Sequence, residues 1–214
     1  MPKLRILLAD DHLLVLEGFR RILESQYELV GTVEDGRALL AAAKELQPDI
    51  VILDISMPLL NGIDAAAQLK KICPSAKIII VTMHADTEYV QSAFEVGATA
   101  YVLKRSAADE LEQAIRAAVM GHSYITPLIT KDMLNVFLSK TSDTSADTHT
   151  LTTRQREVLQ LLAEGRTAKE IANLLKISSR TIEFHKSQIL TRLNLHTTAD
   201  LIKYALTHGI MGTS

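Results

Sequence analysis

Three acidic residues, a threonine and a lysine each follow a short apolar segment of the chain, and these residue types suit phosphoryl-transfer chemistry. They are Asp10, Asp11, Asp54, Thr82 and Lys104. Three carboxylates at close range repel one another, so a pocket that gathers them favours a bound cation. An all-oxygen ligand set with room for water suits Mg²⁺ better than zinc or copper.

Such a pocket fits the transfer of a phosphoryl group to Asp54. The carboxylate attacks as the nucleophile, the metal ion neutralises phosphoryl charge, and Thr82 and Lys104 bind the remaining oxygens. The product is an aspartyl phosphate. Each residue alone has a plainer explanation, since Asp10 and Asp11 precede an expected helix and can act as N-caps. Their joint position after separate apolar segments is what favours the chemical interpretation.

These side chains meet only if the segments before them are strands of one sheet. From residue 4 to residue 120, short β-branched or aliphatic runs alternate with longer stretches of helical period, which predicts a parallel sheet with crossover helices. Ligands of such a sheet bind at the carboxyl ends of its strands. The predicted strands are Leu4–Ala9, Leu29–Val33, Ile50–Leu53, Lys77–Val81 and Ala100–Leu103. The predicted helices cover residues 13–25, 36–46, 63–72, 87–96 and 107–120.

The pattern of these residues resembles the receiver domain of two-component response regulators. The resemblance covers about residues 3–121 and implies a five-stranded parallel flavodoxin-like (βα)5 fold. The matching residues are Asp10-Asp11, Asp54 followed by Met57-Pro58 and Asn61-Gly62, Thr82, Tyr101 and Lys104. Each of these elements alone is common in proteins, whereas the combination is specific.

The resemblance also implies roles for the residues of the pocket. Asp54 is the phosphoacceptor. Asp11 and Asp54, with the backbone carbonyl of Ser56, bind Mg²⁺, and Asp10 completes the acidic metal pocket.

Three further residues take roles by the same resemblance. Thr82 and Tyr101 form the switch pair, and Lys104 contacts the phosphate. An isolated aromatic in a terminal strand also suits core filling, which stays open for Tyr101. Ser56 and His84, each two residues past a site residue, occupy positions that influence the lifetime of the phosphate in this family.

The chain after residue 122 divides into a connection and a second domain. Residues 125–138 have helical spacing of apolar residues and predict a connecting helix, and residues 139–150 are polar enough to predict a flexible linker. The predicted units are a receiver domain at 1–122, a connecting segment at 123–148 and a DNA-binding domain at 149–214.

Helix start signals mark the second domain. Thr152 with Gln155, and Thr167 with Glu170, have the spacing of capping boxes. Ser178 caps a longer helix that runs to about Leu193, and a fourth helix covers Ala199–Thr207. A short helix, a tight turn and a longer helix with a polar face predict a helix-turn-helix, whose longer helix fits the DNA major groove.

This region resembles the LuxR-type DNA-binding domain from Leu151 to about Ile210. The matching residues are Leu151-Thr152-Thr153-Arg154-Gln155-Arg156-Glu157, Gly165, Lys169-Glu170-Ile171-Ala172, Ser178, Thr181-Ile182, His185 and Leu193. Together with the receiver, it gives the domain order of the NarL/FixJ group.

The position of residues on the longer helix predicts DNA contacts. Glu183, Phe184 and Ser187 face base edges, and Arg180 and Lys186 hold phosphates. His185, which has apolar neighbours, is expected to be packed. On the last helix, apolar positions such as Leu201, Ile202 and Leu206 suit either the core or a dimer contact.

Charge is distributed unevenly along the chain. Residues 1–147 hold 14 basic and 20 acidic side chains, a net charge of −6, whereas residues 148–214 hold 9 and 5, a net charge of +4. The basic part suits a polyanionic partner. The single cysteine, Cys73, cannot form an internal disulfide, and we find neither a signal peptide nor a long apolar span, so we expect a cytoplasmic protein without a membrane anchor.

The expected function is a phosphorylation-activated DNA-binding transcriptional regulator of a two-component system, and not an enzyme. The resemblance implies a sensor histidine kinase, double-stranded promoter DNA and, when phosphorylated, a second copy of the chain as partners. The alternative is a phosphotransferase enzyme with an aspartyl-phosphate intermediate, but the haloacid-dehalogenase-like chemistry needs a second aspartate where this chain has Ser56. A nucleotide or flavin carrier is disfavoured because no Gly-rich loop follows the first strand. A further alternative is an adaptor that binds only proteins. A gel-shift assay with promoter DNA distinguishes it, because such an adaptor would not bind the DNA.

Overall fold

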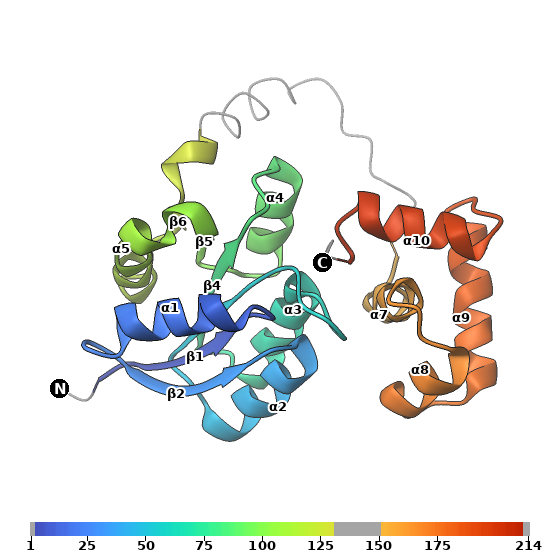
Figure 1. Cartoon of the computed structure of the whole chain (residues 1–214), viewed down its shortest axis with the longest axis horizontal. Helices are drawn as coiled ribbons and strands as arrows, with labels where there is room; N and C mark the ends of the chain where they lie inside the picture. Colours follow the sequence, from blue (N-terminus) through green and yellow to red (C-terminus); the bar gives the residue numbers. More distant parts are fainter. Residues whose placement is uncertain (1–2, 131–150, 212–214) are drawn as a thin grey trace.

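A computed structural model describes residues 3–130 and 151–211 of the chain, and these residues form two domains (Figure 1). The first is a parallel sheet covered by helices, and the second is built of helices. This arrangement confirms the predicted fold class. Within the described ranges, the helices are too short or too polar to cross a membrane.

The sheet of the first domain has six parallel strands in the order β2-β1-β3-β4-β5-β6. Five of them lie within a residue of the predicted strands. The sheet therefore has one strand more than the sequence analysis expects. The strands are β1 (Arg5–Ala9), β2 (Glu28–Val33), β3 (Ile50–Leu53), β4 (Lys77–Thr82), β5 (Ala100–Leu103) and β6 (Tyr124–Ile125).

Helices cover both faces of this sheet, which explains why β1, β3 and β4 are apolar at nearly every position. Successive side chains of a strand point to opposite faces, so Leu7 and Val51 belong to one core and Leu8 and Ile52 to the other. Buried residues of α2, α3 and α4 complete the first core, and those of α1 and α5 complete the second. The helices are α1 (Leu13–Leu23), α2 (Gly36–Leu46), α3 (Gly62–Ile72), α4 (Thr87–Glu95) and α5 (Ala107–Val119).

The extra strand corrects the prediction of one helix over residues 125–138. Ile125 lies in β6, which pairs with β5 through the backbone bonds Tyr124 N to Thr99 O (3.1 Å) and Thr126 N to Tyr101 O (2.9 Å). Backbone carbonyls along the edge of β5 accept these hydrogen bonds. A strand of two residues is too short to produce a periodic pattern of apolar residues, so the sequence does not reveal it. The backbone is helical at 127–130, and the rest of the predicted helix and the predicted linker to residue 150 lie outside the described residues.

The second domain contains the four helices that the sequence predicts. Both predicted capping boxes are present, Thr152 with Gln155 and Thr167 with Glu170, and the Ser178 side chain caps the longer helix. Buried residues of all four helices form one core. The helices are α7 (Thr153–Ala163), α8 (Ala168–Leu175), α9 (Ser179–Arg192) and α10 (Thr198–Thr207). Figure 1 draws α7 between the first domain and α9.

Candidate functional site

The polar residues at the carboxyl ends of the strands gather at one edge of the sheet. Asp10 follows β1, Asp54 follows β3, Thr82 ends β4 and Lys104 follows β5. These four strands are consecutive neighbours in the sheet. The backbone N–H of Asp54 donates to the carbonyl of Ala9 at 3.0 Å, which holds the first two strand ends together.

Lys104 joins the two buried carboxylates of this edge. Its Nζ lies 2.7 Å from Asp10 Oδ2 and 2.7 Å from Asp54 Oδ2. The three side chains are almost fully buried, with exposures of 9% for Lys104 and 3% for each aspartate. One ammonium between two carboxylates leaves an excess of negative charge in a place with little water, and the pocket therefore suits a further cation.

This burial changes how the charged groups titrate. Burial raises the pKa of Asp10 above its usual value of 3.8, and the hydrogen bonds from Lys104 and from the His12 backbone offset only part of the change. Burial alone would lower the pKa of Lys104. The charges and hydrogen bonds of Asp54 and Asp10 outweigh that effect, so its pKa is raised.

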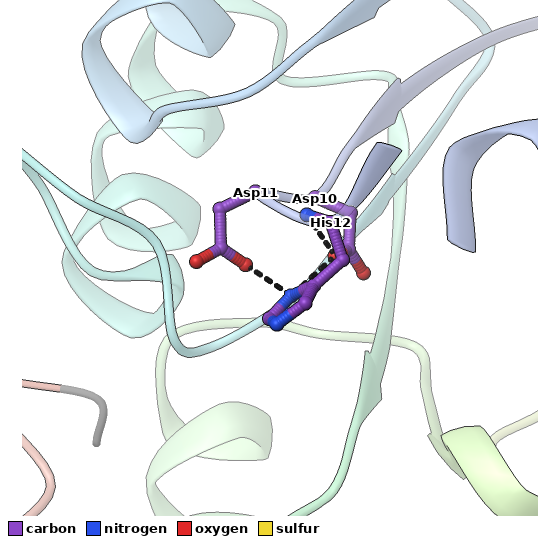
Figure 2. Close-up of side chains that lie close together, drawn as sticks. All are labelled: Asp10, Asp11 and His12. Carbon is purple, nitrogen blue, oxygen red and sulfur yellow. Dashed lines mark hydrogen bonds and ion pairs between the residues drawn. The ribbon is translucent and has the colours of Figure 1, made fainter. Parts of the chain in front are cut away.

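The acidic cluster includes one residue that the sequence analysis missed, His12 (Figure 2). Its Nδ1 lies 2.6 Å from Asp11 Oδ1 and 3.3 Å from Asp10 Oδ1, and its backbone N–H donates to Asp10 Oδ1 at 2.9 Å. The possible ligand atoms of Asp10, Asp11 and His12 lie within 4.8 Å of one another. In the sequence, a histidine that directly follows two aspartates could have indicated that His12 belongs to this cluster.

The donor set of this edge fits Mg²⁺. Asp10 and Asp54 offer buried carboxylate oxygens, and Asp11 offers a partly exposed one at the rim. Oxygen ligands of this charge are what a small hard cation prefers. Lys104 links Asp54 to Asp10, and Asp54 lies outside the group formed by Asp10, Asp11 and His12.

The predicted switch residues, Thr82 at the end of β4 and Tyr101 in β5, both bond to the backbone of His84 in the loop after β4. Tyr101 is fully buried and its hydroxyl donates to the backbone carbonyl of His84 at 2.9 Å, and burial raises its pKa. Thr82 is also fully buried, and its Oγ1 accepts a long hydrogen bond of 3.5 Å from the His84 N–H. The ring of His84 contacts Ser56 Oγ at 2.9 Å and stacks on Tyr89, with ring centroids 4.3 Å apart. Ser56 and His84 therefore lie against each other beside Asp54.

The predicted DNA-contacting residues lie on the accessible side of α9. Arg180, Glu183, Phe184 and Ser187 are exposed, Phe184 by 61%, whereas Lys186 is half-buried. The buried side of the same helix holds Ile182 and Ile189 in the domain core. The aromatic ring of Phe184 is therefore accessible from outside the domain. On α10, Leu201 is core, whereas Leu206 is 39% exposed.

Comparison with known proteins identifies both domains. Residues 6–116 match the response regulator receiver domain, and residues 149–205 match the bacterial regulatory proteins of the luxR family. The chain is 37% identical to the transcriptional regulatory protein MctR of Rhizobium johnstonii, over 98% of this chain and 96% of that protein. It is also 37% identical to the oxygen regulatory protein NreC of Staphylococcus carnosus, over 95% and 97% of the two chains.

Solved structures agree over nearly the whole chain. The RcsB response regulator of Salmonella typhimurium is similar with a TM-score of 0.64 and 30% identity, over 95% of this chain and 97% of that chain. An RcsB–DNA complex is similar with a TM-score of 0.59 and 28% identity, over 94% and 97% of the two chains. The fold, the acidic pocket and the helix-turn-helix together define a response regulator with a DNA-binding output domain. The chain belongs to the NarL/FixJ group of response regulators and is a DNA-binding transcriptional regulator.

The raised pKa of Asp10 gives a test of the buried charge. A carboxyl whose pKa is higher in the folded than in the unfolded state destabilises the fold at neutral pH, and this cost disappears as the pH falls through the folded pKa toward 3.8. Asp10→Asn removes the charge, so we expect a higher melting temperature than wild type at pH 7 and a smaller difference in acid. Thermal unfolding in the absence of divalent ions measures both. Asp109→Asn, at an exposed position, is the control. A variant less stable than wild type at pH 7 would contradict this assignment.

Proposed function

We propose that Asp54 accepts a phosphoryl group from a sensor histidine kinase and that this modification controls DNA binding by the second domain. The observation that carries the proposal is the placement of Asp54 at a strand end, buried and paired with Lys104. The phosphohistidine of the kinase supplies the group. The P–N bond breaks as a carboxylate oxygen of Asp54 forms the new P–O bond, and a proton goes to the histidine nitrogen.

The neighbouring residues each contribute to this transfer. Asp10, Asp11, Asp54 and the backbone carbonyl of Ser56 would hold Mg²⁺, which when bound neutralises charge on the transferred phosphoryl oxygens. Lys104 exchanges its contact with Asp54 for a phosphoryl oxygen. Its ammonium is fixed by Asp10, so it is already oriented for that anion.

The change at Asp54 reaches the rest of the domain through Thr82 and Tyr101. The Thr82 hydroxyl turns toward the phosphoryl group and releases the weak hydrogen bond from the His84 N–H. Because the Tyr101 hydroxyl holds the carbonyl of the same residue, the loop after β4 moves with them. Phosphorylation thus shifts the populations of two arrangements of this surface.

The second domain then recognises promoter DNA through α9. Glu183, Phe184 and Ser187 contact base edges, and Arg180 and Lys186 contact phosphates. Phosphorylated chains pair as a homodimer, and the regulator acts in the cytoplasm. The units are a receiver at 1–122, a connecting segment at 123–148 and a DNA-binding domain at 149–214. The alternative, a phosphotransferase enzyme, is disfavoured because Ser56 stands where a second aspartate is needed.

The phosphoacceptor is tested by treating the protein with Mg²⁺ and a small phosphodonor. We expect the intact mass to show one added phosphate in wild type and in Asp109→Asn, and background incorporation in Asp54→Asn because the nucleophilic oxygen is lost. Equal incorporation in Asp54→Asn would contradict the assignment.

The DNA surface is tested by binding measurements over a range of salt concentrations. Arg180→Ala removes one phosphate contact, so we expect weaker binding to all sequences and a slope of log K against log salt reduced by about 0.9. Phe184→Ala is expected to change the preference among sequences instead. Asn173→Ala, an exposed position on α8, is the control. If Arg180→Ala leaves affinity and salt slope unchanged, α9 does not contact the backbone as proposed.

A further inference from the structure

The backbone that carries Lys104 is held by a residue that the sequence analysis did not single out, Thr126. This side chain is fully buried directly after β6, and its Oγ1 accepts a hydrogen bond of 3.0 Å from the N–H of Leu103. Leu103 ends β5, so the bond acts on the residue directly before Lys104. The Thr126 N–H also donates to the carbonyl of Tyr101 at 2.9 Å. Thr126 lies beyond residues 6–116, which match the receiver domain, so the match does not include it.

The Thr126 side chain continues the pairing with β5 at the point where the backbone turns away from the sheet. The Thr126 carbonyl accepts instead from the Ile129 N–H at 3.1 Å and from the Thr130 hydroxyl at 3.2 Å. The next residue, Pro127, has no N–H to offer the sheet. A buried backbone amide at the end of a strand needs an acceptor, and the Thr126 hydroxyl supplies it to Leu103.

A carboxylate fixes the direction of this hydroxyl. Thr126 Oγ1 donates to Glu110 Oε2 at 2.8 Å, and the Tyr124 hydroxyl donates to the same oxygen at 3.2 Å. An ionised carboxylate only accepts hydrogen bonds, so the one hydroxyl proton of Thr126 points to Glu110 and a lone pair is left for the Leu103 N–H. Burial and the charge of Glu110 raise the pKa of Tyr124, which therefore remains a donor at neutral pH.

The carbonyl side of Leu103 is held as well. It accepts from the Ser106 hydroxyl at 3.2 Å, across the short 3-10 turn Lys104–Ser106. Lys104 thus leaves β5 from an anchored backbone, and its Nζ lies 2.7 Å from both Asp10 Oδ2 and Asp54 Oδ2. Because the two carboxylates follow different strands, a shift of the Lys104 backbone changes at least one of these contacts.

We propose that Thr126 is a positioning residue for phosphoryl transfer, and that it acts by holding Leu103 so that the Lys104 ammonium meets the incoming phosphoryl oxygen. Glu110 supports this role by orienting the hydroxyl. The inference rests on the proposed function of Asp54. A charge that is fixed before the reaction stabilises the transferred group more than one that must first be brought into place.

Two substitutions separate the hydroxyl of Thr126 from its packing. Thr126→Val keeps the shape of the side chain and removes both of its side-chain hydrogen bonds, so we expect phosphate uptake from a small phosphodonor with Mg²⁺ to slow roughly tenfold. Thr126→Ser keeps the hydroxyl and is expected to restore a rate near that of wild type. Thr130→Val makes the same change at an exposed position and is the control. The rates are measured on the full chain by intact mass.

Amide hydrogen exchange reports the anchor itself, without a phosphodonor. In Thr126→Val we expect the Leu103 amide to exchange faster, roughly tenfold, while the amides of β1 and β3 keep their protection. In Thr126→Ser the protection of Leu103 is expected to return.

A double-mutant cycle tests whether Thr126 acts through Lys104. Lys104→Ala alone is expected to slow phosphate uptake about a hundredfold. In that background Thr126→Val is expected to cause little further loss, because two residues that act through one contact are not additive. A general loss of stability would slow uptake equally in both backgrounds.

Three outcomes overturn the inference. A wild-type rate in Thr126→Val, or a rate in Thr126→Ser as low as in Thr126→Val, would show that the hydroxyl does not position the site. An equal loss with and without Lys104 would show that Thr126 acts elsewhere. These outcomes leave Asp54 as the acceptor. If wild type takes up no phosphate at Asp54, the proposed function itself fails, and the positioning role fails with it.

Discussion

The structure depends on one charge arrangement, the ammonium of Lys104 held between the carboxylates of Asp10 and Asp54 at 2.7 Å from each. Two buried carboxylates without it would carry a large desolvation cost and repel each other. With it, they form a pocket that is still short of positive charge. The proposed binding of Mg²⁺ and the proposed transfer of a phosphoryl group to Asp54 rest on this imbalance. The three side chains come together because β1, β3, β4 and β5 are neighbours in the sheet.

A short loop connects this pocket to the contact between the two domains. Asp54 is the first residue after β3, and seven residues later the chain reaches Asn61, whose N–H donates to the other domain. This loop therefore lies between the acidic pocket and the contact with α7.

The sequence predicted the parts of this structure that local patterns determine. Runs of apolar residues predict β1, β3 and β5 to within one residue. A threonine followed three residues later by glutamine or glutamate predicts the starts of α7 and α8. The two-residue strand β6 was missed because its partner edge exists only in the folded sheet. The hydrogen bonds that Gln160, on α7, and Glu164, directly after it, accept from the backbone of Asn61 and Leu59 were missed for a related reason. In the sequence these are ordinary polar positions, and the loop that they contact comes beside them only in the folded chain.

The most direct measurement of the charge arrangement is a crystal structure of the full chain with Mg²⁺ and beryllofluoride. We predict a beryllium adduct on a carboxylate oxygen of Asp54, the metal ion on the oxygens of Asp10 and Asp11, and Lys104 Nζ moved from Asp54 to a fluorine. A chain that binds no adduct at Asp54 under these conditions, or that holds the metal away from both aspartates while Lys104 keeps its present contacts, would contradict the account.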